Sequence, residues 1–346
     1  MNTAVGGWRR LDEFRITAIA LVLGMGVLAG FLSVAGFEVR PALAALWHGA
    51  FGSWDAFTSA TLVRATPLVL LGLAFTLASR AGALNIGMEG QFALGAIGAT
   101  LAGLHLAGVS PAIALPVTLS AGMLGGALWM VVPVGLKLRF GVTEVISTLL
   151  LTFVADAVVS WCVTGPLREV TGVYPQSDPI AIAARLPRLI AGSRLHAGVL
   201  VTLAVSVVLA ISFKYSVWGF RLRAVGAGAT AARVSGGIRT DRVLAGALLW
   251  SGALAGLGGA MEVSGVSYAL YQNLSPGYGF TAIAVALLGR LQPLAVVAAG
   301  LLFGALEAGA GAMQRDAGIP AVAVQVVEAV VILTIIIAAR RGRGAP

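Results

Sequence analysis

The chain has 346 residues, of which 58% are hydrophobic and only 11% are charged, and its mean hydropathy is +0.94. A soluble domain usually carries about 25% charged residues, so this composition excludes an ordinary soluble protein. The net charge of +9 fits arginines in the cytoplasmic loops of a membrane protein, and nucleic acid is not an expected partner.

Long apolar runs follow one another along the chain, and a run of about 20 such residues spans a bilayer core. The runs are continuous rather than alternating, which is typical of helices and not of a β-barrel. We therefore predict an all-α polytopic membrane protein with a single transmembrane domain over residues 1–346. About ten segments are expected: 16–34, 62–79, 86–107, 112–136, 145–164, 197–213, 244–266, 278–289, 292–313 and 320–339.

The first run follows three arginines, as in a signal peptide. It is longer than the apolar region of about 7–15 residues in such peptides, which favours a retained first helix.

The stretch 83–100, at the start of the third segment, carries polar side chains beside glycines. Its candidates for a translocation path are Asn85, Gly87, Glu89, Gly90 and Gln91. Polar groups at membrane depth usually face the bundle interior or an aqueous path, and broken helices occur where they line a cavity. The alternative is close helix packing through small residues, and both interpretations can hold together.

Other carboxylates lie within later apolar runs. Glu262 is a further candidate for the path, whereas interhelical hydrogen bonding is an equal alternative for Asp156, Glu307 and Glu328. Glu144 lies near a predicted helix end, where a carboxylate stabilises a helix N-terminus.

Two hydrophilic stretches separate the apolar runs. Residues 165–196 contain four prolines and are predicted to form an ordered extracytoplasmic loop. Residues 214–243 carry six basic residues and one acidic residue, and they are predicted to form a cytoplasmic loop. A short helix is expected from Ala229 to Val234, ended by Gly236 and Gly237. That helix is either a docking element or part of a basic loop held near anionic lipid headgroups.

The segment 278–289 is too short to span a bilayer at about 1.5 Å per residue. It follows Ser275-Pro276-Gly277, which breaks a helix, so a half-helix or a re-entrant pair is expected. Tyr278 and Phe280 in this segment are placed with the path. Their rings can stack on a nucleobase or belong to an interfacial aromatic belt.

Charge predicts the orientation of the chain. With both termini in the cytoplasm, more than twice as many lysines and arginines face the cytoplasm as face outward. The positive-inside rule favours this arrangement.

The sequence lacks the motifs of an enzyme. Neither of the two lysines, Lys137 and Lys214, follows the glycine-rich loop of an ATPase. The three histidines have no metal-ligand spacing. No catalytic residue, metal site or cofactor is therefore expected.

Four stretches together resemble the permease subunits of bacterial ABC importers, in the branch of ribose, branched-chain amino acid and nucleoside permeases. They occur in the expected order over roughly residues 60–340, and the nucleoside-type permeases are the most similar. The stretches are RAGALNIGMEGQFALGAIGA, GVTEVISTLLLTF, GFRLRAVGAGATAARVSGGI and SPGYGFTAIAVALLGRLQPLAVVAAGLLFGALEAG.

The resemblance implies a subunit of the cytoplasmic (inner) membrane that pairs with an identical or related permease. It also implies two ATPase subunits in the cytoplasm and a substrate-binding protein outside. The residues expected to couple to the ATPase are Arg223, Ala231, Ala232, Arg233, Gly236 and Gly237. The positions before the paired alanines, 227–230, lack the acidic or amide residues common in the family, so one expected polar contact is missing.

Two functions remain open from the sequence. The first is an ATP-driven importer subunit for a small polar solute, with a nucleoside preferred over a sugar or a vitamin-like heterocycle. The second is a stand-alone transporter driven by an ion gradient through carboxylates such as Glu89, for which inverted repeats would be expected.

Overall fold

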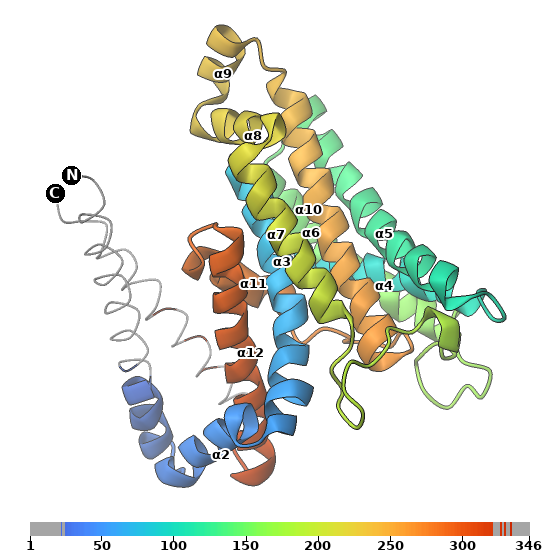
Figure 1. Ribbon diagram of the computed structural model, residues 1–346, viewed down its shortest axis with the longest axis vertical. Helices are drawn as coiled ribbons and strands as arrows, with labels where there is room; N and C mark the ends of the chain where they lie inside the picture. Colours follow the sequence, from blue (N-terminus) through green and yellow to red (C-terminus); the bar gives the residue numbers. More distant parts are fainter. Residues whose placement is uncertain (1–21, 23–24, 321–325, 327–328, 330–332, 334–346) are drawn as a thin grey trace. The chain divides into compact units, whose positions relative to one another are not determined.

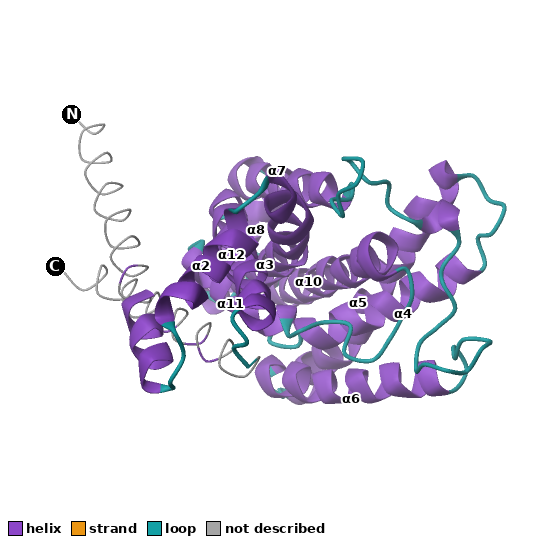
Figure 2. Ribbon diagram, turned by 90° about the horizontal axis from the view of Figure 1, so that it is seen from below, coloured by secondary structure: helices purple, strands orange, loops and turns teal. Residues whose placement is uncertain are grey.

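The computed structural model describes residues 25–320 and the single positions 22, 326, 329 and 333. This part of the chain consists of helices and loops (Figure 2), and its only β-type pairing is two isolated bridges. The predicted all-α class is confirmed for these residues. They form two compact units, one of residues 65–301 and the other drawn from residues 1–64 and 302–346.

Among the described residues, six helical stretches are long and apolar enough to cross a membrane, and two of them join two elements. They are Ala56–Arg80, which joins the π-helix η1 (Ala56–Thr61) to α3 (Leu62–Arg80); α5 (Pro111–Phe140); α6 (Glu144–Thr164); α7 (Gly198–Tyr215); Thr240–Ser267, which joins α10 (Thr240–Glu262) to the π-helix η3 (Val263–Ser267); and α12 (Pro293–Asp316).

Two predicted segments are shorter helices in the structure. α4 (Met88–Leu104) has 17 residues, and α11 (Tyr278–Leu288) has 11, as expected for a half-helix. The segment 320–339 lies almost wholly outside the described residues, as does the first half of 16–34. Six candidate spans are therefore established, and the count of ten stays a prediction.

Helices α4, α5 and α10 pack together in the unit 65–301 (Figure 1). Glycines line their contacts: a Cβ on Gly95 would overlap the backbone of Gly256, and one on Gly126 would overlap the backbone oxygen of Gly252. Such small residues let membrane helices approach closely.

Two short helices follow α7 at one end of this unit, α8 (Val217–Ala227) and α9 (Ala229–Gly236). The predicted short helix is confirmed as α9, and Gly237 ends it in the left-handed conformation with φ 57°. α8 was not predicted; Ser216 caps it by accepting a hydrogen bond of 2.9 Å from the backbone N–H of Gly219.

The segment between α6 and α7 lies at the other end of the unit (Figure 1). It contains one 3-10 turn, η2 (Ile182–Ala184). The backbone N–H groups of Ser177 and Ile180 donate to the carbonyls of Leu270 and Tyr268, each at 2.8 Å. The segment is thus hydrogen-bonded to the loop that precedes α11.

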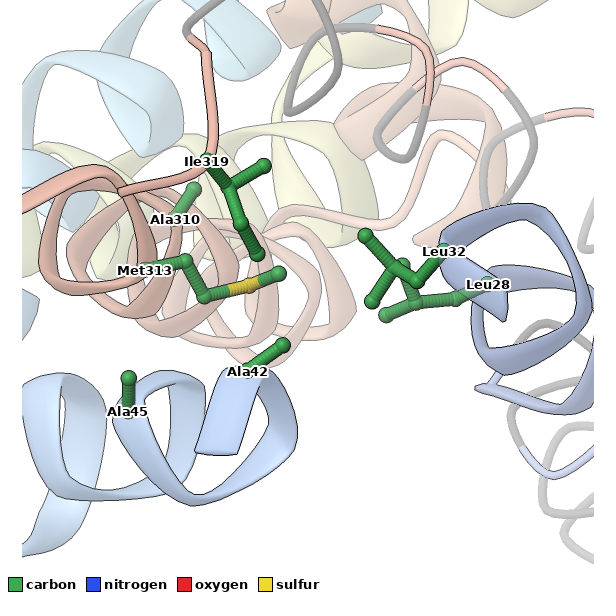
Figure 3. Close-up of a cluster of buried hydrophobic side chains, with 7 residues drawn as sticks. All are labelled: Leu28, Leu32, Ala42, Ala45, Ala310, Met313 and Ile319. Atoms are coloured by element: carbon green, nitrogen blue, oxygen red, sulfur yellow. The ribbon is translucent and has the colours of Figure 1, made fainter. Parts of the chain in front are cut away.

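The second unit contains α2 (Val39–Phe51), which was not predicted, and the end of α12. A small apolar core holds them together (Figure 3). Its buried side chains are Leu28, Leu32, Ala42, Ala45, Ala310, Met313 and Ile319.

Candidate functional site

A closed polar network lies at the start of α4. The side-chain amides of Asn85 and Gln91 donate to each other at 2.7 and 2.9 Å. Asn85 also donates to the hydroxyl of Ser251 at 2.9 Å, which in turn donates to the carbonyl of Ala74 at 2.7 Å. All three side chains are buried. Since each amide is satisfied inside the protein, this network joins α4 to α10 and α3.

The glycines of this region pack against α6. A Cβ on Gly87 would overlap the backbone of Thr148, and one on Gly90 would lie 2.9 Å from the Cα of Thr152. The close packing considered as an alternative is therefore present at these glycines. A part for Asn85, Gly87, Gly90 and Gln91 in the translocation path stays a prediction.

Glu89 joins the beginnings of two helices. It lies in the first turn of α4, and its Oε2 accepts a hydrogen bond of 2.6 Å from the backbone N–H of Gly279, in the first turn of α11. Because backbone N–H groups at a helix N-terminus favour a negative group, this carboxylate holds the half-helix α11 against α4.

A cavity of about 390 Å³ opens beside Glu89, between α4, α6, α11 and the loop before α11. Polar and apolar side chains share its wall. They are Glu89, Phe92, Ala93, Ala96, Asp156, Val159, Ser160, Leu270, Gln272, Asn273, Leu274, Ser275 and Phe280.

Of the predicted path residues, the cavity includes Glu89 and Phe280. Tyr278 and Glu262 are buried and are not part of its lining. The ring of Tyr278 meets that of Phe92 edge-on, with centroids 6.2 Å apart.

Asp156 was left open between the path and interhelical hydrogen bonding, and Ser160, Gln272 and Asn273 were not predicted to lie in the path. A signal existed for two of them: Asp156 and Ser160 are one helical turn apart, so they share a face of α6. Gln272 comes from a loop, and its amide donates to the hydroxyl of Ser160 at 2.6 Å. That contact depends on tertiary structure and has no local pattern.

A second hollow, of about 760 Å³, lies between α8, α9 and the start of α10. Four of the predicted coupling residues line it: Ala231, Ala232, Gly236 and Gly237. Three arginines add positive charge to its wall, namely Arg221, Arg239 and Arg242.

The other two predicted coupling residues lie elsewhere. Arg233 donates to the carboxylate of Asp241 at 3.0 Å and to the hydroxyl of Thr240 at 2.7 Å, which ties α9 to α10. Arg223 lines a separate depression with Arg80.

Metal binding has no support in the part of the chain that the structure describes. Within it, no three His, Cys, Asp or Glu side chains are grouped so that they could hold an ion.

Candidate membrane spans, a half-helix beside a polar cavity and short helices at one end are typical of a polytopic helical membrane protein. The chain belongs to the family of the branched-chain amino acid transport system permease component, whose model matches residues 57–339. It is thus a permease subunit of an ABC transporter and a multi-pass protein of the cytoplasmic (inner) membrane. The resemblance found in the sequence is confirmed.

Several curated relatives are similar over most of their length. A guanosine ABC transporter permease protein of Bacillus subtilis is 36% identical, with 94% of this chain and 93% of the relative covered. A nucleoside ABC transporter permease protein of Lactococcus lactis is 31% identical, with 92% and 90% covered. A glucose ABC transporter permease protein of Haloferax volcanii is 40% identical, with 80% and 74% covered. No solved structure matches the chain.

Proposed function

We propose that this subunit carries nucleosides into the cell, with ATP hydrolysed by a separate ATPase. The observation that carries the proposal is the similarity to guanosine and nucleoside permeases over at least 90% of both chains. The cavity beside Glu89 supports it, because its wall combines the Phe280 ring with carboxylate, amide and hydroxyl groups. A nucleoside likewise combines a flat base with a hydroxylated ribose.

A sugar is the second candidate substrate. It is favoured by the relative with the higher identity, the glucose permease at 40%. A sugar would use the polar groups of the cavity but would gain little from stacking on Phe280.

The proposed complex contains a second permease subunit, identical or related, two ATPase subunits and an extracytoplasmic binding protein. In this arrangement the hollow between α8 and α9 receives the ATPase, and the residues 165–196 face the binding protein. The two regions lie at opposite ends of the unit 65–301 (Figure 1), as transport across the membrane requires.

The test is uptake into proteoliposomes that hold the complete complex, with ATP inside the vesicles and the binding protein outside. Labelled guanosine and labelled glucose are compared in parallel. Guanosine uptake that needs ATP and is insensitive to ionophores is the expected result.

Two results would reject parts of the proposal. Uptake of glucose but not guanosine would show that the substrate is a sugar rather than a nucleoside. Uptake by this chain alone, driven by a proton or sodium gradient, would reject the ATP-driven mechanism in favour of an ion-coupled transporter.

A further inference from the structure

Asp156 is a carboxylate in the middle of a membrane-spanning helix. α6 extends from Glu144 to Thr164, which places Asp156 about 18 Å along a helix that rises about 1.5 Å per residue. Its side chain is exposed and lines the cavity of about 390 Å³. It makes no hydrogen bond or ion pair with any described residue.

The surroundings of Asp156 differ from those of the other carboxylate in this cavity. Glu89 already accepts a hydrogen bond from the backbone N–H of Gly279. Ser160, one turn beyond Asp156, accepts the amide of Gln272. Asp156 therefore retains its full capacity to accept hydrogen bonds from a molecule inside the cavity.

Lipid is an unsuitable neighbour for this group. A charged side chain at the bilayer centre is costly, and such groups face a cavity or pair with a partner. Other exposed residues of α6, such as Phe153, Val154 and Trp161, are apolar or aromatic and suit lipid or a helix of another subunit. Asp156 departs from that pattern where the cavity opens.

We infer that Asp156 contacts the solute during its passage, by accepting hydrogen bonds from hydroxyl groups, and thereby favours hydroxylated solutes. The inference rests on the proposed transport of a nucleoside or sugar, and the hydroxyl groups are the chemistry that both share. The ring of Phe280 lines the same cavity. It would favour a nucleoside over a sugar, because only a nucleoside has a base that can stack on it.

The experiment compares the complete complex carrying wild-type chain, Asp156→Ala or Asp156→Asn. Transport rates are measured with the binding protein saturated, so that its own selectivity does not enter. The solutes are guanosine and 2′,3′-dideoxyguanosine, with glucose and 2-deoxyglucose as the sugar pair. Val154→Ala is the matched control, because Val154 is exposed on the same helix but outside the cavity lining.

We expect Asp156→Ala to lower the rate ratio of guanosine to its dideoxy analogue by about tenfold, the factor that corresponds to one lost hydrogen bond to a charged group. Asp156→Asn keeps one acceptor oxygen and should lose less of this ratio. If the rate ratio falls only for glucose over 2-deoxyglucose, the role of Asp156 is supported and the transported solute is a sugar rather than a nucleoside.

Other outcomes would overturn the inference. An unchanged rate ratio in both pairs would do so while leaving the proposed function intact. Loss of the second permease from the purified complex of both variants would assign Asp156 to subunit pairing instead. If the wild-type complex transports neither guanosine nor glucose, the proposed function fails and the inference fails with it.

Discussion

At the scale of single residues, the carboxylate of Glu89 has the most specific geometry. Replacing it in Glu89→Ala leaves the N–H of Gly279 without its acceptor, and a buried unpaired polar group costs about 1–3 kcal/mol. We expect the half-helix α11 to lose its fixed position, so that transport falls more than tenfold while the subunit still assembles.

Glu89→Gln is the matched variant, because it keeps an oxygen that can accept from Gly279. Uptake and co-purification of the complex are measured together. Wild-type transport by an assembled Glu89→Ala complex would remove the proposed role, and disappearance of the subunit from the membrane would make Glu89 purely structural.

His196 gives a pH dependence outside the spanning helices. Its ring is buried and its Nδ1 accepts a hydrogen bond of 3.2 Å from the N–H of Gly198. Burial, with a smaller contribution from Arg194, lowers the pKa of His196 from 6.5 to about 4. Because the unfolded state binds the proton more readily, the stabilisation from neutral His196 is complete above pH 6.5 and is lost as the pH falls toward 4.

We therefore expect the melting temperature of the purified subunit to fall between pH 7.5 and pH 5. The fall should be smaller in His196→Gln, which offers an acceptor but does not titrate. Equal falls in both proteins would show that other groups cause the pH dependence.

The polar cluster at 85–91 shows how far the candidate site could be predicted from the sequence. Its concentration of Asn, Glu and Gln beside glycines was visible, and it lies beside the cavity. The partners were not visible: Ser251, which completes the amide network, is 166 residues from Asn85. The fold is needed to see that the amides of Asn85 and Gln91 bond each other, whereas the carboxylate of Glu89 lines the cavity.

At the scale of elements, glycine contacts between α5 and α10 determine how closely these helices pack. A Cβ on Gly256 would overlap the backbone of Gly122, and overpacking of this kind costs about 1–3 kcal/mol. Gly256→Ala should therefore lower the melting temperature of the subunit by several degrees.

Gly246→Ala is the control, since it lies on the same helix with no atom within 4 Å of its new Cβ. Alanine has a higher helix propensity than glycine by about 1 kcal/mol, so this variant should be neutral or slightly more stable. Equal destabilisation by both substitutions would contradict the packing argument, and the comparison is made by thermal unfolding in detergent.

The elements that the sequence predicted well are those with long apolar runs, because a membrane span needs many consecutive apolar residues. α2 and α8 were missed because they have only 13 and 11 residues and contain charged or polar residues. The half-helix α11 was predicted correctly, because the Ser-Pro-Gly sequence before it cannot continue a helix.

At the scale of the whole molecule, the sequence predicted the class of protein from composition and the family from four ordered motifs. The orientation stays a prediction from the distribution of arginines. This orientation predicts that α8 and α9 face the ATPase and that the segment 165–196 faces outward. The two regions lie at opposite ends of the unit 65–301, which is compatible with that orientation.

In the proposed complex, the contact between permease and ATPase transmits energy to the cavity. The hollow between α8 and α9 contains small residues, including Ala231 and the buried Ala232. Ala231→Trp and Ala232→Trp should fill the hollow. Gly236→Pro should disturb the end of α9, because proline fixes φ and removes a backbone donor. We expect at least a tenfold loss of ATPase co-purification or of substrate-stimulated ATP hydrolysis, with normal membrane insertion.

The charges of the hollow separate an ATPase contact from a lipid contact. Arg221, Arg239 and Arg242 form a positive wall that suits an acidic surface on the ATPase, so Arg242→Glu should weaken ATPase binding most at low salt. Arg223→Glu, outside the hollow, tests the lipid alternative, for which transport would depend on the content of anionic lipid.

Leu138→Trp, exposed on α5, controls for the added bulk of the tryptophan variants Ala231→Trp and Ala232→Trp. If the tryptophan and proline variants bind the ATPase and support transport normally, the energy enters through another part of the permease, even though the family assignment is unaffected.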